Sequence, residues 1–189
     1  MTYRIAVVVG SLRRESFNRQ LADALVKLAP PGFELVPSRI DDLPLYNQDD
    51  DKNQAAPVLR LKGELTAAQG VLFVTPEYNR SIPGVLKNAI DNASRPYGQS
   101  AWAGKPAGVI GISVGAIGTA LAQQHLRNIL AYLDMPTLGQ PEVFLQNKHG
   151  LFGPDGSITA DDTKQFVQKY LETYAAWVKH HADRVANRS

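Results

Sequence analysis

Tyr3-Arg4-Ile5-Ala6-Val7-Val8-Val9-Gly10, near the amino terminus, is the stretch that decides the fold. A nearly continuous run of apolar and mostly β-branched residues is typical of a strand buried on both faces, as in a parallel sheet. A polar loop follows, and then a predicted helix carries Leu21, Leu25 and Leu28 on one side. Pro30-Pro31-Gly32 ends this helix, because proline cannot continue a helical hydrogen-bond pattern.

The same alternation of strand and helix continues along the chain. We expect further strands over residues 33–36, 70–75, 106–113 and 142–145, and helices over residues 57–68, 84–93 and 119–133. The apolar stripe of a long last helix is interpreted as core packing, and it consists of Phe166, Tyr170, Tyr174, Trp177 and Val178. An irregular acidic segment over residues 41–53 is expected to be held down by Leu43, Leu45 and Tyr46.

Five strands that alternate with five helices predict a doubly wound α/β sheet in a single domain over residues 1–189. Right-handed crossovers then place helices on both faces of the sheet. In such folds the ligand binds at the carboxyl ends of the strands, near the point where the strand order reverses. The loops to inspect are therefore those over residues 10–18, 75–83 and 113–119.

Composition excludes several classes of function. Apolar residues make up 44% of the 189 residues and charged residues 20%, which suits a folded domain and not a disordered chain. The net charge is +2, from 20 Lys and Arg against 18 Asp and Glu, which argues against a nucleic-acid-binding protein. The sequence has no cysteine, so disulfides, thiolate zinc sites, iron–sulfur clusters and a cysteine nucleophile are excluded.

Neither a membrane span nor a metal centre is expected. The longest strongly apolar run, Ile5 to Val9, is far shorter than the roughly 20 residues of a membrane helix. Arg13 and Arg14 stand where a signal peptide would need a small-residue cleavage site. We therefore expect a soluble protein of the cytoplasm.

A metal centre is not expected, because the adjacent His180 and His181 would point about 100° apart on a helix, which suits no shared metal.

The first loop, Gly10-Ser11-Leu12-Arg13-Arg14-Glu15-Ser16-Phe17-Asn18, leads into a helix and predicts a phosphate site. Free backbone N–H groups and the dipole at a helix start favour an anion. Ser11, Ser16 and Asn18 add short donors, and Arg13 adds a charge with forked geometry. The alternative is a solvated basic turn in which Ser16 is an ordinary N-cap. Neither a G-x-G-x-x-G nor a Walker A sequence is present, so a Rossmann dehydrogenase and a P-loop NTPase are not supported.

The second loop, Thr75-Pro76-Glu77-Tyr78-Asn79-Arg80-Ser81-Ile82-Pro83-Gly84, is stiffened by two prolines. Such a segment can lay backbone amides against the edge of a flat heteroaromatic ring. The alternative is a structural turn in which Glu77 and Arg80 are merely solvated. Its position after a buried strand favours the functional interpretation.

The third loop contains Gly111-Ile112-Ser113-Val114-Gly115, which matches the G-x-S-x-G nucleophile elbow of hydrolases. Asp134 with His149, or Asp155 with His180, would satisfy the order of such a triad. However, only 76 residues follow Ser113 in this chain of 189, and no H-G-G-G segment is present. A glycine-rich turn at Gly115 and Gly118, which lets a flat ligand approach the backbone, is the favoured interpretation.

Together, the first loop and the run Pro76-Glu77-Tyr78-Asn79-Arg80-Ser81-Ile82-Pro83-Gly84-Val85-Leu86-Lys87-Asn88-Ala89-Ile90-Asp91, with Ser94-Arg95, closely resemble the NAD(P)H-dependent FMN reductase family. Within it the chain is most similar to the bacterial quinone and chromate reductases, over nearly its whole length. The resemblance implies a flavodoxin-like sheet with the strand order 2-1-3-4-5. Two departures bear on the substrate side: Asn92, where relatives often carry an aromatic residue, and Thr119, where a small residue is common.

The resemblance further implies FMN as cofactor, with NADH or NADPH as co-substrate. It implies a phosphate site made by Ser11, Arg13, Ser16 and Asn18, with Phe17 also among the cofactor-binding residues. Pro76, Glu77, Tyr78 and Asn79 would border the isoalloxazine ring, and Ser113 and Gly115 would close its pyrimidine side. No side chain is implied to act as an acid or base, because the flavin supplies the reactivity, and no metal is implied.

The implied mechanism is ping-pong: hydride passes from NAD(P)H to FMN, and the electrons then pass to a quinone, chromate or a similar small acceptor. The resemblance implies a homodimer or homotetramer with the flavin near a subunit interface. We expect that contact in the segment 94–102, with Tyr97 and Trp102; the alternative for this segment is a packed surface loop. The alternative function is a flavodoxin-type FMN electron carrier without nicotinamide chemistry. Such carriers are strongly acidic, so the net charge of +2 argues against one.

Overall fold

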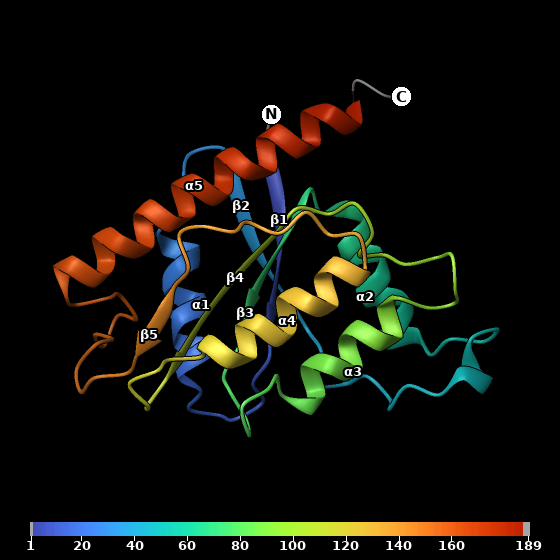
Figure 1. Ribbon diagram of the computed structural model, residues 1–189, viewed down its shortest axis with the longest axis horizontal. Coiled ribbons are helices and arrows are strands. Elements are labelled where there is room, and N and C mark those ends of the chain that lie inside the picture. Colours follow the sequence, from blue (N-terminus) through green and yellow to red (C-terminus); the bar gives the residue numbers. More distant parts are fainter. Residues whose placement is uncertain (1, 187–189) are drawn as a thin grey trace.

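The computed structural model describes residues 2–186, in which five strands form a parallel sheet with helices around it (Figure 1). The strands are β1 (Tyr3–Val9), β2 (Phe33–Ser38), β3 (Gly70–Val74), β4 (Ala107–Ser113) and β5 (Phe144–Gln146). The α-helices are α1 (Phe17–Lys27), α2 (Ala56–Ala67), α3 (Gly84–Ala93), α4 (Ala120–Tyr132) and α5 (Asp161–Ala186), and a short 3₁₀ helix, η1, spans Gln48–Asp50. The predicted alternation of strands and helices is confirmed.

The strands lie in the order β2-β1-β3-β4-β5, which confirms the expected flavodoxin-like order. The pairing is parallel throughout; Ile5 of β1 is opposite Gly70 of β3, and Val71 of β3 is opposite Ala107 of β4. The order reverses between β1 and β3, because β2 adds on one side and β4 on the other. Ligands of doubly wound sheets bind at this switch point.

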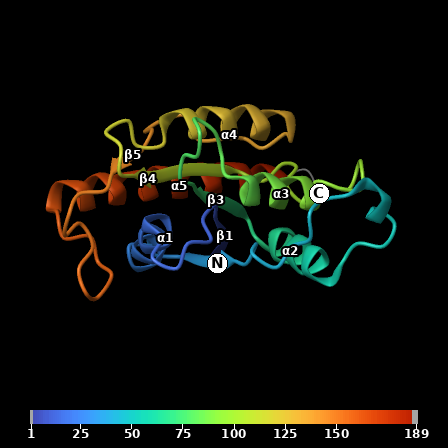
Figure 2. The ribbon, with the colours of Figure 1, turned by 90° about the horizontal axis from the view of Figure 1, so that it is seen from below.

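Successive residues of the central strands face opposite layers of helices. Ile5, Val7 and Val9 belong to a core shared with α1 and α5, whereas Ala6 and Val8 belong to a core shared with α2, α3 and α4. Figure 2, which looks along the sheet, shows this arrangement of helices on both sides. The side-chain period of two explains why the run near the amino terminus had to be apolar at every position.

Two tyrosines of α5 lie directly on glycines of the sheet. The rings of Tyr170 and Tyr174 are nearly parallel, with centroids 6.4 Å apart, and burial raises the pKa of both hydroxyls. A Cβ on Gly108 would lie 2.7 Å from the Tyr170 hydroxyl, and one on Gly70 would lie 2.9 Å from the Tyr174 hydroxyl. Glycine in these strands therefore makes room for the rings, and Tyr174 donates to the carbonyl of Pro106 at 3.3 Å.

The predicted apolar stripe of α5 is wrong at its first member. Phe166 is 41% exposed, whereas the adjacent Val167 is fully buried and starts the true stripe with Tyr170, Leu171, Tyr174 and Val178. Val167 lies 3, 4, 7 and 11 positions before these residues, which keeps all of them on one helical face. Phe166 is rotated off that face by one residue.

The acidic segment 41–53 is held by polar contacts more than by the expected apolar ones. Leu43 is partly buried, but Leu45 is 84% exposed, so its predicted packing role is wrong. Asn88 of α3 accepts from the N–H of Tyr46 and donates to the carbonyl of Pro44. Asn92, one turn later, donates to the same carbonyl at 3.0 Å. This gives Asn92 a structural role that a phenylalanine could not fill by hydrogen bonding.

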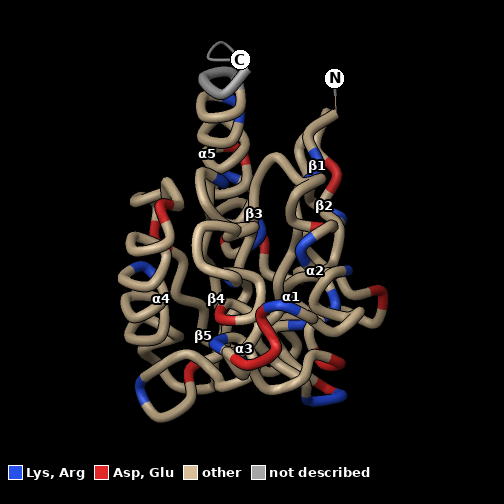
Figure 3. Tube along the Cα trace, turned by 90° about the vertical axis from the view of Figure 1, so that its right-hand side faces the viewer, with Lys and Arg blue, Asp and Glu red and all other residues tan. Residues whose placement is uncertain are grey.

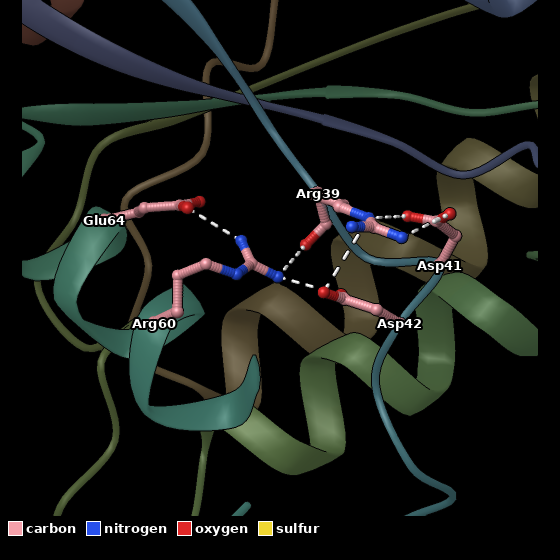
Figure 4. Close-up of polar contacts among 5 residues, drawn as sticks. All are labelled: Arg39, Asp41, Asp42, Arg60 and Glu64. Atoms are coloured by element: carbon pink, nitrogen blue, oxygen red, sulfur yellow. Dashed lines mark hydrogen bonds and ion pairs between the residues drawn. The ribbon is translucent and has the colours of Figure 1, made fainter. Parts of the chain in front are cut away.

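Ion pairs fasten the start of this segment to α2 (Figure 4). Arg39 contacts Asp41 at 2.7 Å, and Arg60 of α2 contacts Asp42 at 2.9 Å and Glu64 at 2.7 Å. Arg60 also donates to the backbone carbonyl of Arg39. The Arg39 guanidinium lowers the pKa of the Asp41 carboxyl through their hydrogen bond. Most of these side chains are partly exposed, so each pair contributes modestly, roughly 0–1 kcal/mol.

Lys and Arg are interspersed with Asp and Glu along the chain, as Figure 3 shows. Among residues 2–186, no helix combines the length and apolar character that crossing a bilayer requires. The same residues contain no group of three or more His, Asp or Glu side chains arranged to hold a metal ion.

Replacing Gly63 by alanine is expected to stabilise the protein. Gly63 lies exposed inside α2, and a Cβ built there meets no atom within 4 Å. Because glycine costs conformational entropy in a helix, Gly63→Ala is expected to raise the free energy of unfolding by about 0.5–1 kcal/mol. Urea denaturation followed by circular dichroism measures this change.

Gly111→Ala is the contrasting variant, because a Cβ there would lie 2.2 Å from the Thr75 carbonyl oxygen and 2.3 Å from Thr119 Oγ1. Overpacking of this kind is expected to lower the free energy of unfolding by about 1–3 kcal/mol. Equal midpoints for the two variants would contradict this account of the glycines.

Candidate functional site

The loops after β1, β3 and β4 meet at one edge of the sheet. These strands are adjacent and parallel, so their carboxyl ends point the same way. Figure 1 shows the three loops together at its lower edge, and Figure 2 faces them. The structure therefore brings together the segments 10–18, 75–83 and 113–119, and with them all the predicted site residues.

The first loop presents unused backbone donors beside a helix start. Ser16 is the N-cap of α1, and its Oγ accepts from the N–H of Arg19 at 3.2 Å. Within the described part of the chain, the N–H groups of residues 11–15 make no hydrogen bond, although Ser11 is only 5% exposed. Unpaired donors near a helix amino terminus suit a phosphate group. The residues present thus fit the phosphate end of FMN.

Arg13 extends over the half-buried ring of Phe17, with its guanidinium carbon 4.7 Å from the ring centroid. Stacking of this kind orients the planar guanidinium and leaves its edge N–H groups free to donate. Phe17 therefore supports Arg13 from the first residue of α1. The neighbouring Arg14 is exposed and makes no comparable contact among the described residues.

Asn18 joins the first loop to the third. It is 3% exposed, its Nδ2 donates to the carbonyl of Ile112 at 2.9 Å, and its Oδ1 accepts from the N–H of Ile112 at 3.1 Å. The side chain thereby fastens α1 to the end of β4, 94 residues away. One amide hydrogen remains, because the side-chain NH₂ group has two.

The second loop is a tight hairpin. Tyr78 and Ser81 exchange two backbone hydrogen bonds, of 2.9 and 3.0 Å. Between them, Asn79 has φ +52° and Arg80 has φ +64°, so both central residues are left-handed, as in a type I′ turn. The backbone N–H groups of Glu77 and Asn79 make no hydrogen bond within residues 2–186. The hairpin thus offers rigid backbone donors at the mouth of the sheet.

Glu77 and Arg80 are not merely solvated, as the alternative interpretation held. The Glu77 side chain is 9% exposed and lies 3.6 Å from Arg80. Its Oε2 accepts from the N–H groups of Leu121 and Ala122 at the start of α4. Tyr78, in contrast, is 50% exposed at the same edge.

The third loop does not have the geometry of a nucleophile elbow. Ser113 Oγ donates to the carbonyls of Gly115 and Gly118, so its hydroxyl closes the loop, and within residues 2–186 it makes no hydrogen bond to a histidine. The Asp155 carboxylate binds Ser157, and His180 contacts His181, so the second suggested triad pair does not form.

Packing accounts for two of the glycines in this loop, but not for a third. Gly111 is required by the contacts with Thr75 and Thr119 described above. Gly118 has φ +63°, and a Cβ there would lie 2.8 Å from the backbone of Phe144. Gly115 is different, because a Cβ would meet only Ser113 Oγ at 3.8 Å and its φ is ordinary. Nothing in the fold requires glycine at this position, which fits a site where a flat ligand approaches the backbone.

Comparison with known proteins decides the family. Residues 3–150 match the model of the NADPH-dependent FMN reductases. The chain belongs to the NADPH-dependent FMN reductase family. It is 52% identical over 179 residues to a Burkholderia protein named 2-hydroxy-1,4-benzoquinone reductase, covering 95% of this chain and 98% of that protein.

Two further proteins similar to this FMN reductase support the assignment. A quinone reductase of Pseudomonas putida is 50% identical over 179 residues, covering 94% of this chain and 95% of the relative. FerB from Paracoccus denitrificans, a flavoenzyme NAD(P)H:(acceptor) oxidoreductase of known structure, superposes with a TM-score of 0.92 at 44% identity. The match covers 95% of this chain and 99% of FerB. The protein is therefore an oxidoreductase that uses FMN and a nicotinamide nucleotide.

One expectation about the surface of this FMN reductase is wrong. Trp102 was expected in a subunit contact, but it is fully buried, with its indole N–H donating to the carbonyl of Ile90 at 3.0 Å. Its ring packs 5.7 Å from that of Phe73, so it belongs to the core between β3 and α3. Tyr97, in the same segment, is 83% exposed.

Ser113→Ala in this FMN reductase is expected to keep most of its turnover, because the hydroxyl closes the loop and is expected to contact the ligand, not to act as a nucleophile. A net contribution of about 0.5–1.5 kcal/mol per hydrogen bond predicts no more than somewhat weaker FMN retention. Steady-state assays and FMN titration measure both. Covalent labelling of Ser113 by a fluorophosphonate would contradict this assignment and support the esterase alternative.

Proposed function

We propose that this FMN reductase transfers electrons from NADH or NADPH through FMN to quinones, with chromate or similar small oxidants as further acceptors. The observation that carries the proposal is the set of unpaired N–H groups at residues 11–15 beside Arg13 and the start of α1. The names of the relatives support quinones as the acceptor class. Anaerobic bleaching of the flavin by each nicotinamide, followed by reoxidation with a quinone, tests the proposal.

The proposed phosphate site consists of Ser11, Arg13, Ser16, Phe17 and Asn18. Arg13 contributes the charge and Phe17 orients it. Ser16 still has its hydroxyl hydrogen to donate, because its Oγ acts as an acceptor in the helix cap. Asn18 has one amide hydrogen left beyond its bond with Ile112. The backbone N–H groups of the loop supply the remaining donors.

The proposed ring site consists of Pro76, Glu77, Tyr78 and Asn79 on one side and Ser113 and Gly115 on the other. The unpaired N–H groups of Glu77 and Asn79 suit the acceptor atoms along the edge of an isoalloxazine ring. Gly115 leaves space where the third loop would meet the pyrimidine end. Tyr78, which is half exposed, would lie beside the ring.

When bound, FMN supplies the redox chemistry, accepting two electrons from the nicotinamide and passing them on. The chain's own part is to bind the phosphate, hold the ring edge with backbone amides and control which molecules reach the ring face. The proposed site includes no side chain acting as an acid or base, and no metal. This distinguishes it from a hydrolase site, in which a base must contact the nucleophile.

The electron-carrier alternative differs from a reductase in the molecules with which it exchanges electrons. A flavodoxin-type carrier exchanges electrons with protein partners and does not oxidise a nicotinamide. NAD(P)H oxidation by the purified protein with a quinone, and without any protein partner, separates the two functions. Such carriers are strongly acidic, whereas this chain has a net charge of +2.

We further propose that the chain acts as a single FMN-binding domain over residues 1–189 and works in the cytoplasm as a homodimer or homotetramer. Nucleic acid and membrane are not among the proposed partners. Tyr97 and Tyr132, which are 83% and 81% exposed, line a surface hollow with Arg95 and Asp134 and are suited to a subunit contact. Sedimentation equilibrium of Tyr97→Ser and Tyr132→Ser tests the contact.

Ping-pong kinetics are expected, because nicotinamide and quinone would use the same face of one flavin ring in turn. Double-reciprocal plots of rate against NAD(P)H concentration, at several fixed quinone concentrations, should give parallel lines. Intersecting lines together with a demonstrable ternary complex would contradict this mechanism.

Arg13→Ala is expected to weaken FMN binding by about ten- to a hundred-fold, because a charge-assisted hydrogen bond contributes roughly 1.5–3 kcal/mol. Riboflavin lacks the phosphate, so its affinity should hardly change. Fluorescence titration of both flavins measures the effect.

Arg14→Ala is the matched control for Arg13, since the adjacent side chain is exposed and is not part of the proposed site. It should leave the affinities for both flavins unchanged. Equal weakening of FMN and riboflavin by Arg13→Ala would show that the phosphate assignment is wrong.

A further inference from the structure

Glu77 caps a helix to which it does not belong. Its Oε2 accepts from the N–H of Leu121 at 3.0 Å and from the N–H of Ala122 at 3.1 Å. These residues are the second and third of α4, whose N–H groups an N-cap side chain ordinarily satisfies. The actual N-cap, Thr119, makes no side-chain cap bond, and the first turn of α4 contains no acidic residue. The capping carboxylate therefore comes from the hairpin, about 44 residues earlier in the chain.

Hydrogen bonds and a nearby cation compensate for the burial of the Glu77 carboxylate in this position. The side chain is 9% exposed, and a buried carboxylate is costly unless it is hydrogen-bonded. Two backbone donors, the positive end of the helix dipole and the nearby Arg80 together provide that compensation. The contact is thus a well-satisfied tie between the hairpin and α4, which are far apart in the sequence.

A second contact strengthens the tie one helical turn further along. His125 Nδ1 lies 3.0 Å from Ser81 Oγ, at the far end of the hairpin. The hairpin is stiff in itself, because Tyr78 and Ser81 are paired and the two residues between them are left-handed. The whole unit 77–81 is therefore fixed to α4 at both of its ends.

The same helix continues directly from the third loop. Within that loop the N–H of Gly118 donates to the carbonyl of Gly115, and Ser113 Oγ donates to the carbonyl of Gly118. The buried Thr119 lies against Gly111 of β4 and accepts from Gln123 of α4. Any displacement of the start of α4 relative to the hairpin would thus change the distance between the second and third loops.

We infer that Glu77 is a positioning residue that sets the spacing between the two loops around the flavin ring. The inference rests on the proposed ring site, which has the second loop on one side and the third loop on the other. In this arrangement Glu77 contributes twice: its backbone N–H faces the ring edge, and its carboxylate holds the hairpin to α4. The pocket is then formed before the cofactor enters, which lowers the cost of ordering it.

Two variants of the full-length FMN-loaded enzyme separate acceptor geometry from charge. Glu77→Ala removes the acceptor, and Glu77→Gln keeps an oxygen of the same reach. Glu172→Ala, an exposed position on α5, is the matched control for loss of one carboxylate. The measurements are the Kd for FMN, the flavin absorption spectrum, KM and kcat for a benzoquinone, and amide hydrogen exchange at Leu121 and Ala122.

Loss of the cap in Glu77→Ala is expected to raise the Kd for FMN on the order of tenfold and to speed exchange at both amides by a similar factor. The flavin spectrum should shift and the KM for the quinone should change more than kcat. Glu77→Gln should bring the Kd back to within about threefold of the wild-type value, because the amide oxygen still accepts both bonds. The control should leave all four measurements unchanged.

Wild-type values for FMN affinity and amide exchange in Glu77→Ala would overturn the inference. Equal impairment of Glu77→Ala and Glu77→Gln would also overturn it, because the effect would then follow the charge and not the geometry. Failure of the proposed function is seen separately, in a wild-type protein that binds no FMN. In that event amide exchange at Leu121 and Ala122 in the flavin-free chain still measures the tie, and unchanged exchange in Glu77→Ala would refute it.

Discussion

Burial of the central sheet on both faces is the constraint on which the rest of the structure depends. β1, β3 and β4 are covered by helices on either side, so nearly every side chain along them must be apolar or absent. Polar side chains and free backbone donors are thereby confined to the strand ends, where the chain emerges from between the helices. The three loops at the carboxyl edge are consequently the place where donors, charges and unconstrained glycines can gather around one ligand.

The fold could be predicted largely from local pattern, because each central strand is a short apolar run between turn residues. The wrong predictions concern residues whose burial had to be inferred from their position along a helix or in a loop. Phe166 and Val167 are both apolar, and only the packing of α5 on Gly70 and Gly108 decides which of them faces the sheet. Leu45, which was expected to pack, is exposed, and Trp102, which was expected at a surface contact, is fully buried. Both lie outside regular strands and helices, where the local pattern does not indicate burial.

The candidate site was predictable as three loops, but not as a connected unit. Sequence patterns indicate which residues follow a strand and which donors a phosphate prefers. They contain no sign that Asn18 binds Ile112, 94 positions away, or that Glu77 binds the first turn of α4. Both partners are backbone groups, which every residue possesses, so no residue type marks them in advance. The G-x-S-x-G pattern is misleading for a related reason, because Gly111 is required by its close packing against Thr75 and Thr119 and not by a nucleophile.

The contact between Glu77 and α4 has an asymmetric consequence for how such a protein can change over time. On α4 the carboxylate contacts only main-chain amides, so positions 121 and 122 can accept almost any helix-compatible side chain without disturbing it. Position 77 has no such freedom. Methods that detect contacts from paired substitutions would therefore miss this one, because only one partner records it in its identity. The two loops could diverge in composition, and so in acceptor preference, while their separation stayed the same.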